Sequence, residues 1–195
     1  MSTRKSDKRT LTIDDVAKIK TLSEVRISPD GEKVAFTVRS MNLEKNSYEG
    51  NIYLISPSGG ESIKLTEDGG SQPRWSPDGR KIAFVASKEG KRGIWLMDLK
   101  GENKRKVTDF DLSNASLGPV GESLCWSPDG SMIAFLASLE PVDKEAKIKV
   151  ITRLMYKAFF GYSDMRRRHI FVVSPLGHEP PRQLTFGDFD EHSIS

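Results

Sequence analysis

Short apolar segments alternate with polar turns along this chain, and the same order of segments returns three times. At the centre of each repeat, one alanine stands between two large apolar residues. These triplets are Val34-Ala35-Phe36, Ile82-Ala83-Phe84 and Ile133-Ala134-Phe135. Because side chains alternate across a β-strand, the large residues point to one face of a sheet and the alanine to the other. The alanine predicts a sheet that is covered on both faces and approached closely by a neighbouring sheet.

The tetrapeptide Ser-Pro-Asp-Gly precedes each triplet, at residues 28–31, 76–79 and 127–130. In such a turn, proline presets φ, aspartate hydrogen-bonds its own backbone and glycine takes the left-handed conformation. Two further strand-like segments follow each triplet, and the second ends in a threonine (Thr66, Thr108, Thr185). A single copy of the tetrapeptide would indicate only a common hairpin turn. Three copies about 50 residues apart, each with the same downstream strands, predict four-stranded antiparallel blades of a β-propeller.

We therefore predict an all-β fold of propeller blades, preceded by a short N-terminal helix. The arm and helix are expected in residues 1–21, and the partial propeller in residues 22–195. The blades are expected at about 22–69, 70–110 and 111–186, with the start of a fourth at 187–195. Propellers close with about 4–8 blades, so three blades do not close a ring. We expect the chain to be the N-terminal portion of a longer protein.

The segment Leu11–Lys20 lies outside the repeat and is expected to be a short helix. Thr12 stands at the N-cap position, and Asp14 and Asp15 in the first turn suit the positive end of the helix dipole. The apolar side of this helix is formed by Val16, Ala17 and Ile19. Two interpretations stay open. The helix plugs the ring or docks on another domain, or it is a frayed arm packed on its own propeller.

A long insertion, Leu139–His169, separates the second and third strands of the last blade. It interleaves basic and aromatic residues: Lys147, Lys149, Arg153, Tyr156, Lys157, Phe159, Phe160, Tyr162, Arg166, Arg167 and Arg168. This mixture is found in proteins that bind single-stranded nucleic acid, but a cationic loop is more often a solvated face. The chain has 30 basic and 27 acidic residues, a formal net charge of +3, and so supplies no supporting basic field. We expect no nucleic acid partner.

No arrangement of residues in the sequence indicates catalysis. The segment Gly161-Tyr162-Ser163-Asp164-Met165 lacks the second glycine and the strand–turn–helix context of a nucleophile elbow, which argues against Ser163 as a nucleophile. The histidines at 169, 178 and 192 are scattered, without metal-ligand spacing. The sequence therefore predicts no catalytic residue, no metal and no cofactor, and it leaves the substrate-binding residues unknown.

The remaining sequence features bear on the compartment. The single Cys125 excludes an internal disulfide and is expected to be a small buried hydrophobe. No stretch approaches the roughly 20 apolar residues of a membrane helix. Residues Met1–Thr10 are charged and polar, unlike a secretory signal. We expect a cytoplasmic protein with no membrane contact.

Several of these segments resemble the start of prolyl-oligopeptidase-type serine peptidases, in particular the acylaminoacyl-peptidase (acylamino-acid-releasing enzyme) branch. The resemblance covers nearly the whole chain from Leu11 onward. Its most specific part is Thr152-Arg153-Leu154-Met155-Tyr156-Lys157, then Gly161-Tyr162, then Arg166-Arg167-Arg168-His169-Ile170-Phe171-Val172-Val173. That branch usually has Asp/Asn-Gly in the middle, where this chain has Ala158-Phe159-Phe160, so the tip of the loop is expected to differ.

The resemblance implies a two-domain enzyme with an N-terminal propeller of about seven blades and a C-terminal α/β-hydrolase that holds a Ser-Asp-His triad. It implies that the propeller gates access of short (N-acylated) peptides to the active site, and that the helix at Leu11–Lys20 packs against the hydrolase. No triad residue can be placed on this chain, because none of those motifs falls within it. The implied partners are the hydrolase domain of the same protein and short peptide substrates, while homo-oligomerisation stays open. The alternative is a non-enzymatic TolB-like or WD40-like propeller that binds other proteins, because such propellers share the Ser-Pro-Asp-Gly repeats.

Overall fold

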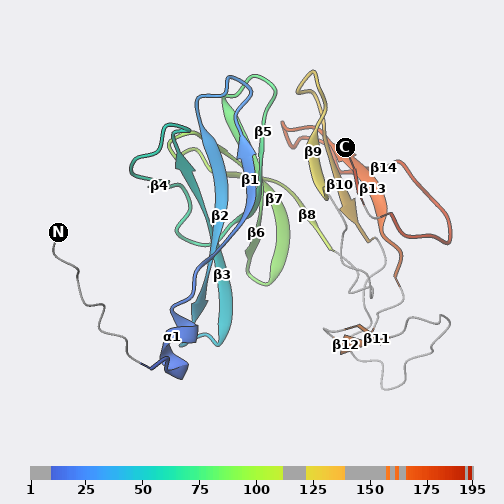
Figure 1. Ribbon diagram of the computed structural model, residues 1–195. Helices are drawn as coiled ribbons and strands as arrows, with labels where there is room; N and C mark the ends of the chain where they lie inside the picture. Colours follow the sequence, from blue (N-terminus) through green and yellow to red (C-terminus); the bar gives the residue numbers. More distant parts are fainter. Residues whose placement is uncertain are drawn as a thin grey trace.

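Three four-stranded antiparallel sheets stand side by side in the structure (Figure 1). The structure is a computed structural model that describes residues 10–111, 122–138, 157–158, 161–162, 166–191 and 193–194. In this part of the chain the only helix is α1 (Ile13–Ala17), which lies outside the sheets. The all-β fold with propeller blades and a short N-terminal helix, predicted from the repeat, is confirmed.

In each blade the strands lie in the sheet in the order in which they occur in the sequence. The first blade contains β1 (Thr21–Ile27), β2 (Val34–Asn42), β3 (Ser47–Ile55) and β4 (Ile63–Lys64). The second contains β5 (Ser71–Trp75), β6 (Lys81–Lys88), β7 (Lys91–Asp98) and β8 (Arg105–Phe110). The third contains β9 (Leu124–Trp126), β10 (Ile133–Ala137), β13 (His169–Val173) and β14 (Arg182–Gln183). Between β10 and β13 a separate small ribbon pairs β11 (Lys157–Ala158) with β12 (Gly161–Tyr162).

The Ser-Pro-Asp-Gly segments form the turns between the first and second strands of the blades. Gly31, Gly79 and Gly130 have φ values of 76°, 67° and 72°, the left-handed region that glycine adopts without strain. Each glycine N–H donates to the carbonyl oxygen of the first serine of its turn, at 2.9, 2.8 and 2.9 Å. The tight hairpins expected from the tetrapeptide are confirmed.

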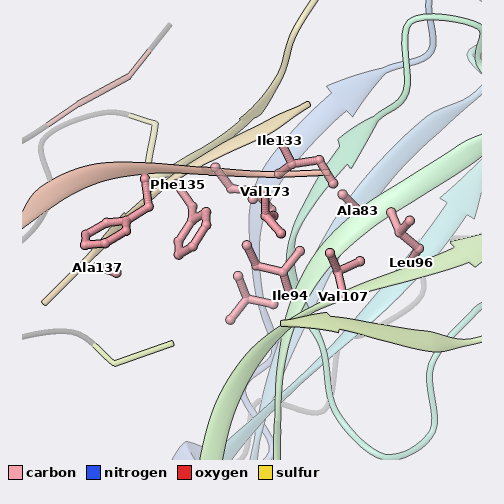
Figure 2. Close-up of a cluster of buried hydrophobic side chains, with 11 residues drawn as sticks. Ala83, Ile94, Leu96, Val107, Ile133, Phe135, Ala137 and Val173 are labelled. Atoms are coloured by element: carbon pink, nitrogen blue, oxygen red, sulfur yellow. The ribbon is translucent and has the colours of Figure 1, made fainter. Parts of the chain in front are cut away.

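The core lies between the blades, and the apolar triplets build it. Ile82 and Phe84 pack with Ala35 and Ile52 of the first blade. On the opposite face of the second sheet, Ala83 packs in a second cluster that includes Ile133, Phe135, Ile94, Val107 and Val173, gathered between the second and third blades in Figure 2. Ala35 and Ala83 have no exposed surface, as expected for alanines that a neighbouring sheet approaches closely, whereas Ala134 of the third triplet is half-buried.

The outward face of the first blade is apolar and has no neighbouring sheet in the described part of the chain. Phe36 and Tyr53 stack on this face with their ring centroids 5.9 Å apart, and both are half-buried. Ile27, which pairs with Val34 and so lies on the same face as Phe36, is 62% exposed. The first blade therefore presents the same kind of face that Ile82 and Phe84 bury between the first and second blades.

Helix α1 is shorter than the Leu11–Lys20 segment expected to be helical. Its start is as expected, since the N–H and hydroxyl of Thr12 both donate to Oδ2 of Asp15, each at 2.9 Å. The helix ends at Ala17 because Lys18 caps it and β1 already begins at Thr21, which leaves no room for another turn. In Figure 1, α1 lies beside the hairpin between β2 and β3, and β11 and β12 lie at the same end of the blades. We call this the α1 end; the Ser-Pro-Asp-Gly turns lie at the opposite end.

Candidate functional site

The first strands of the first two blades each contain a β-bulge. Strands β1 and β5 lose register with their neighbours just before Arg26 and Arg74, respectively. The bulged residues Glu24 and Gln72 have left-handed φ values of 56° and 55°. Residues with side chains seldom adopt this conformation, and at a bulge it redirects the side chain. The same distortion at the same place in two blades indicates a repeated structural role.

Both redirected side chains bind the first strand of the following blade or its leading residue. Oε2 of Glu24 accepts hydrogen bonds from Nη1 and Nη2 of Arg74, each at 3.2 Å. Oε1 of Gln72 accepts from the hydroxyl of Ser123, just before β9, at 2.8 Å. Since β1 contacts β5 and β5 contacts β9, these bonds join all three blades along their first strands.

Arg74 is the centre of an ion cluster between the blades. Its guanidinium is nearly buried and pairs with Glu24 of the first blade and with Glu122, just before the third. Nε also donates to the carbonyl oxygen of Leu124 at 3.0 Å, and Arg26 pairs with the same Glu122. Burial lowers the pKa of Arg74, while Glu24 acts in the opposite direction and favours the charged form. We call Glu24, Arg26, Arg74 and Glu122 the inter-blade ion cluster.

A pocket of about 620 Å³ opens next to this cluster, between the first two blades. The bulged residues Glu24 and Gln72 line it. So do Arg39 of β2, Arg92 of β7 and Asp68 of the connection between β4 and β5. Arg39 and Arg92 lie near the β2–β3 and β6–β7 hairpins, so this inter-blade pocket is at the α1 end. Its volume is within the range of small-molecule sites.

Gly50 and Gly70 are in close backbone contact in the wall of the inter-blade pocket. The N–H of Gly70 donates to the carbonyl oxygen of Gly50 at 2.8 Å. A Cβ atom on Gly50 would lie 3.1 Å from the carbonyl oxygen of Gly70 and 3.2 Å from Cγ2 of Thr37. Both contacts are tighter than side chains ordinarily accept, so a larger residue at position 50 would push the β4–β5 connection away from β3.

Most charges that line the pocket are already paired. Nζ of Lys45 lies 2.8 Å from Oε1 of Glu49, and this hydrogen bond holds the pKa of Lys45 above its ordinary value and the pKa of Glu49 below its own. Glu67 pairs with Lys64, and Glu24 pairs with Arg74. Among the described residues, the lining charges without an ion-pair partner are Arg39, Arg92 and Asp68.

The basic run Arg166–Arg168, considered as a nucleic acid contact or a solvated face, is largely buried and paired with acidic residues. Arg166 and Arg168 are 5% and 3% exposed. Nη1 of Arg166 lies 2.9 Å from Oδ2 of Asp111, and the backbone N–H of Arg168 donates to Oδ1 of Asp190 at 2.9 Å. Arg167 pairs with Asp190 and Asp188. These arginines fasten the end of the insertion to the residues before and after the third blade. The basic residues Lys147, Lys149 and Arg153 of the insertion lie outside the described residues. The backbone of Lys157 is described in β11, but its side chain is not.

The remaining candidate residues form no reactive group in the described ranges. His169 is buried and meets the ring of Phe189 edge-on at 5.9 Å, His178 is exposed, and Ser163 lies outside the described residues. Cys125 is half-buried, and burial raises the pKa of its thiol. In the part of the chain that the structure describes, no three His, Cys, Asp or Glu side chains come together as a metal site would require. None of the described helices has the length and apolarity to cross a membrane.

The bulges and the inter-blade pocket were missed by sequence reasoning. A weak signal was present, because Glu24 and Gln72 stand two residues before Arg26 and Arg74, at equal distances from their Ser-Pro-Asp-Gly turns. The third copy has Ser123 and Cys125 at these positions, which hides the pattern.

Two proteins named as peptidases are similar to this chain, one in sequence and one in structure. The chain is 35% identical over 147 residues to the uncharacterized peptidase YuxL of Bacillus subtilis (strain 168), a match that covers 72% of this chain and 21% of YuxL. A solved acylaminoacyl peptidase, in complex with Z-Gly-Gly-Phe-chloromethyl ketone, superposes with a TM-score of 0.68 at 25% identity. This superposition covers 87% of the chain and 26% of the enzyme. In full proteins such propellers are attached to C-terminal peptidase domains.

Proteins named TolB also resemble the chain. The Tol-Pal system protein TolB of Alcanivorax borkumensis (strain ATCC 700651 / DSM 11573 / NCIMB 13689 / SK2) is 29% identical over 110 residues, which are 53% of this chain and 24% of that protein. The chain thus spans about a fifth to a quarter of the length of these relatives. Residues 8–152 match the family described as the TolB beta propeller domain (PD40). With its three sheets and repeated turns, the chain belongs to the TolB beta propeller domain family.

Proposed function

We propose that this chain is the N-terminal propeller portion of an acylaminoacyl-peptidase-like serine peptidase. In this proposal the propeller gates the access of short, N-acylated peptides to a C-terminal α/β-hydrolase domain that holds the catalytic triad. The observation that carries it is the match of most of the chain to peptidases, in sequence to YuxL and in blade arrangement to an acylaminoacyl peptidase. A cytoplasmic location is part of the same proposal.

Helix α1 and the residues that flank it support the proposal, because large apolar side chains there are exposed in the described part of the chain. Val16 in the helix is 62% exposed, and Leu11 and Ile19 on either side of it are 83% and 57% exposed. An apolar side that its own blades leave in solvent is available to a further domain. We assign that position to the hydrolase, which would then sit at the α1 end of the blades.

The test uses the full-length protein encoded by the gene of this chain. We expect it to cleave N-acetyl-phenylalanine p-nitroanilide faster than the unblocked phenylalanine p-nitroanilide, and to be inactivated by Z-Gly-Gly-Phe-chloromethyl ketone. The 195 residues alone are expected to cleave neither substrate and to resist a serine-directed fluorophosphonate, because no nucleophile–base pair is present in the sequence. Labelling of Ser163 by that probe would contradict this assignment.

A second experiment on the full-length protein tests the role of α1. Removing residues 1–20 is expected to lower both the melting temperature and kcat/KM. Replacing Val16 and Ile19 by serine should reproduce part of the loss, since each buried aliphatic side chain contributes roughly 1.5–3 kcal/mol. Leu43→Ser is the matched control, because Leu43 is 64% exposed in the β2–β3 hairpin at the same end. Unchanged stability and kinetics after the truncation would refute the bridging role of α1.

The second candidate function is a non-enzymatic binding propeller, favoured by the similarity to the TolB protein of Alcanivorax borkumensis. A full-length protein that resists the fluorophosphonate probe and cleaves neither substrate would support this function in place of the peptidase.

A further inference from the structure

We infer that the inter-blade pocket is a binding site for the terminal carboxylate of a short peptide. This site belongs to the propeller itself and requires no hydrolase domain. It goes beyond the proposed gating function, because a gate needs only an opening and not a charged recognition site.

The inference rests first on the unpaired guanidinium groups. Arg39 on β2 and Arg92 on β7 both line the pocket and are exposed, and neither makes an ion pair with a described residue. In contrast, Lys45 on the same rim is engaged by Glu49 at 2.8 Å. A guanidinium group presents a planar set of N–H donors that matches a carboxylate, and such charge-assisted bonds are stronger than neutral ones.

The charge of the lining selects a singly charged ligand. The pocket has three cationic side chains, Arg39, Lys45 and Arg92, and four acidic ones, Glu24, Glu49, Glu67 and Asp68. Glu24, Glu49, Glu67 and Lys45 are paired within the protein, so the charges left for a ligand are Arg39, Arg92 and Asp68. Two positive charges and one negative charge give a net +1, which matches a single carboxylate better than a doubly charged phosphate. Asp68 is the one unpaired acid, and it would repel an anion at the same site.

The lining residues and volume of the pocket suit a peptide chain. Tyr48 lines it and is 68% exposed, so its ring offers an apolar surface to a side chain of the ligand. Ser23, Ser71 and Ser87 also line it, and their hydroxyl groups can exchange hydrogen bonds with peptide groups. The volume of about 620 Å³ accommodates a ligand of a few residues.

The test is calorimetric titration of the 195-residue chain with N-acetyl-Ala-Ala-Phe, in parallel with the same peptide as its C-terminal amide and with inorganic phosphate. We expect the free acid to bind at least about tenfold more tightly than the amide and than phosphate, with an affinity that falls as salt increases. Equal binding of acid and amide, tighter binding of phosphate, or no binding of the acid at millimolar concentration would overturn the inference.

Substitutions that are expected to change the affinity for the free acid in opposite directions make the test specific. Arg39→Gln and Arg92→Gln should each weaken binding of the free acid by about five- to tenfold, while Asp68→Asn should strengthen it by removing a like charge. Arg80→Gln is the matched control, because Arg80 is an exposed arginine at the opposite end of the blades. All four positions are on the surface, and an unchanged melting temperature shows that the fold is retained. If Arg39→Gln and Arg92→Gln bind the acid as the unmodified chain does, the site is wrongly assigned.

Discussion

The indole Nε1 of Trp126 in the third blade lies 3.1 Å from the carbonyl oxygen of Arg74 in the second and donates a hydrogen bond to it. One blade earlier, Nε1 of Trp75 donates in the same way to the carbonyl oxygen of Arg26 at 3.0 Å. Both tryptophans stand directly before a Ser-Pro-Asp-Gly turn. The tryptophan of one blade therefore fastens the first strand of the preceding blade, and the sequence repeat includes this contact.

Trp126→Phe should lower the free energy of unfolding by about 0.5–1.5 kcal/mol more than Trp95→Phe does, because only Trp126 loses an inter-blade hydrogen bond. Trp95 is half-buried like Trp126, and its indole N–H makes no hydrogen bond with a described residue. Urea unfolding followed by circular dichroism measures both losses. Equal losses would show that the hydrogen bond does not hold the blades together.

Arg74→Met should lower the free energy of unfolding by about 3–5 kcal/mol, because Glu24 would lose its ion-pair partner and Glu122 would keep only Arg26. The double variant Arg74→Met with Glu24→Gln should recover part of that loss, since the uncompensated charge of Glu24 is then removed. Arg92→Met is the control and should stay within about 0.5 kcal/mol of the unmodified chain. A loss for Arg74→Met no larger than this would show that the ion cluster contributes nothing to stability.

Thr37→Val should raise the free energy of unfolding by about 1 kcal/mol. Oγ1 of Thr37 is buried and has no hydrogen-bond partner among the described residues, and an unpaired buried hydroxyl destabilises the folded state. Thr66→Val should have the opposite effect, because Oγ1 of Thr66 accepts from the N–H of Ile52 at 2.9 Å and donates to Asn51 at 3.2 Å. The two melting temperatures, measured in the same buffer, should move in opposite directions. A destabilised Thr37→Val would mean that this hydroxyl is bonded in solution.

Asp129→Asn should reduce stability at neutral pH but not near pH 2. The hydroxyl of Ser127 and the backbone N–H and hydroxyl of Ser131 donate to Asp129 and lower its pKa from 3.8 to about 2. Because the pKa is lower in the folded chain, the carboxylate stabilises the fold above the unfolded value of 3.8, and this contribution is lost as the pH falls through about 2. Urea midpoints of both proteins between pH 7 and pH 2 should therefore converge in acid. A constant difference over that range would assign the effect to packing.

The turns of the first two blades contain the same kind of hydrogen bond to aspartate. Substituting these aspartates should therefore change the pH dependence of stability in the same direction as Asp129→Asn. Asp30 and Asp78 accept hydrogen bonds from Ser28 and Ser76, at 2.5 and 2.6 Å, and these bonds lower the pKa of both carboxyl groups. Asp30→Asn and Asp78→Asn should each lower stability at pH 7 and lose that effect in acid.

The blades and their turns could be predicted from the sequence because they depend on local physical chemistry. Glycine at positions 31, 79 and 130 is the residue that accepts a left-handed φ, and the alternation around Ala35 and Ala83 allows only one assignment of faces. The N-terminal boundary of α1 could also be predicted, because Thr12 and Asp15 are close enough in the chain to bond locally. These features need only residues a few positions apart.

Only the tertiary structure decided what the charged residues do. The sequence shows Arg166, Arg167 and Arg168 as a basic run, yet contacts with Asp111 and Asp190 from other parts of the chain bury or fasten them. Likewise, Arg74 pairs with Glu24 and Glu122, which are about 50 residues away in the sequence. The pocket beside them is lined by residues from both of the first two blades. A long side chain can be solvated, paired or buried, and the difference lies in which residues the packing of the blades places within a few ångströms. Local pattern thus determined the blades, and the packing between them determined the inter-blade ion cluster and the inter-blade pocket.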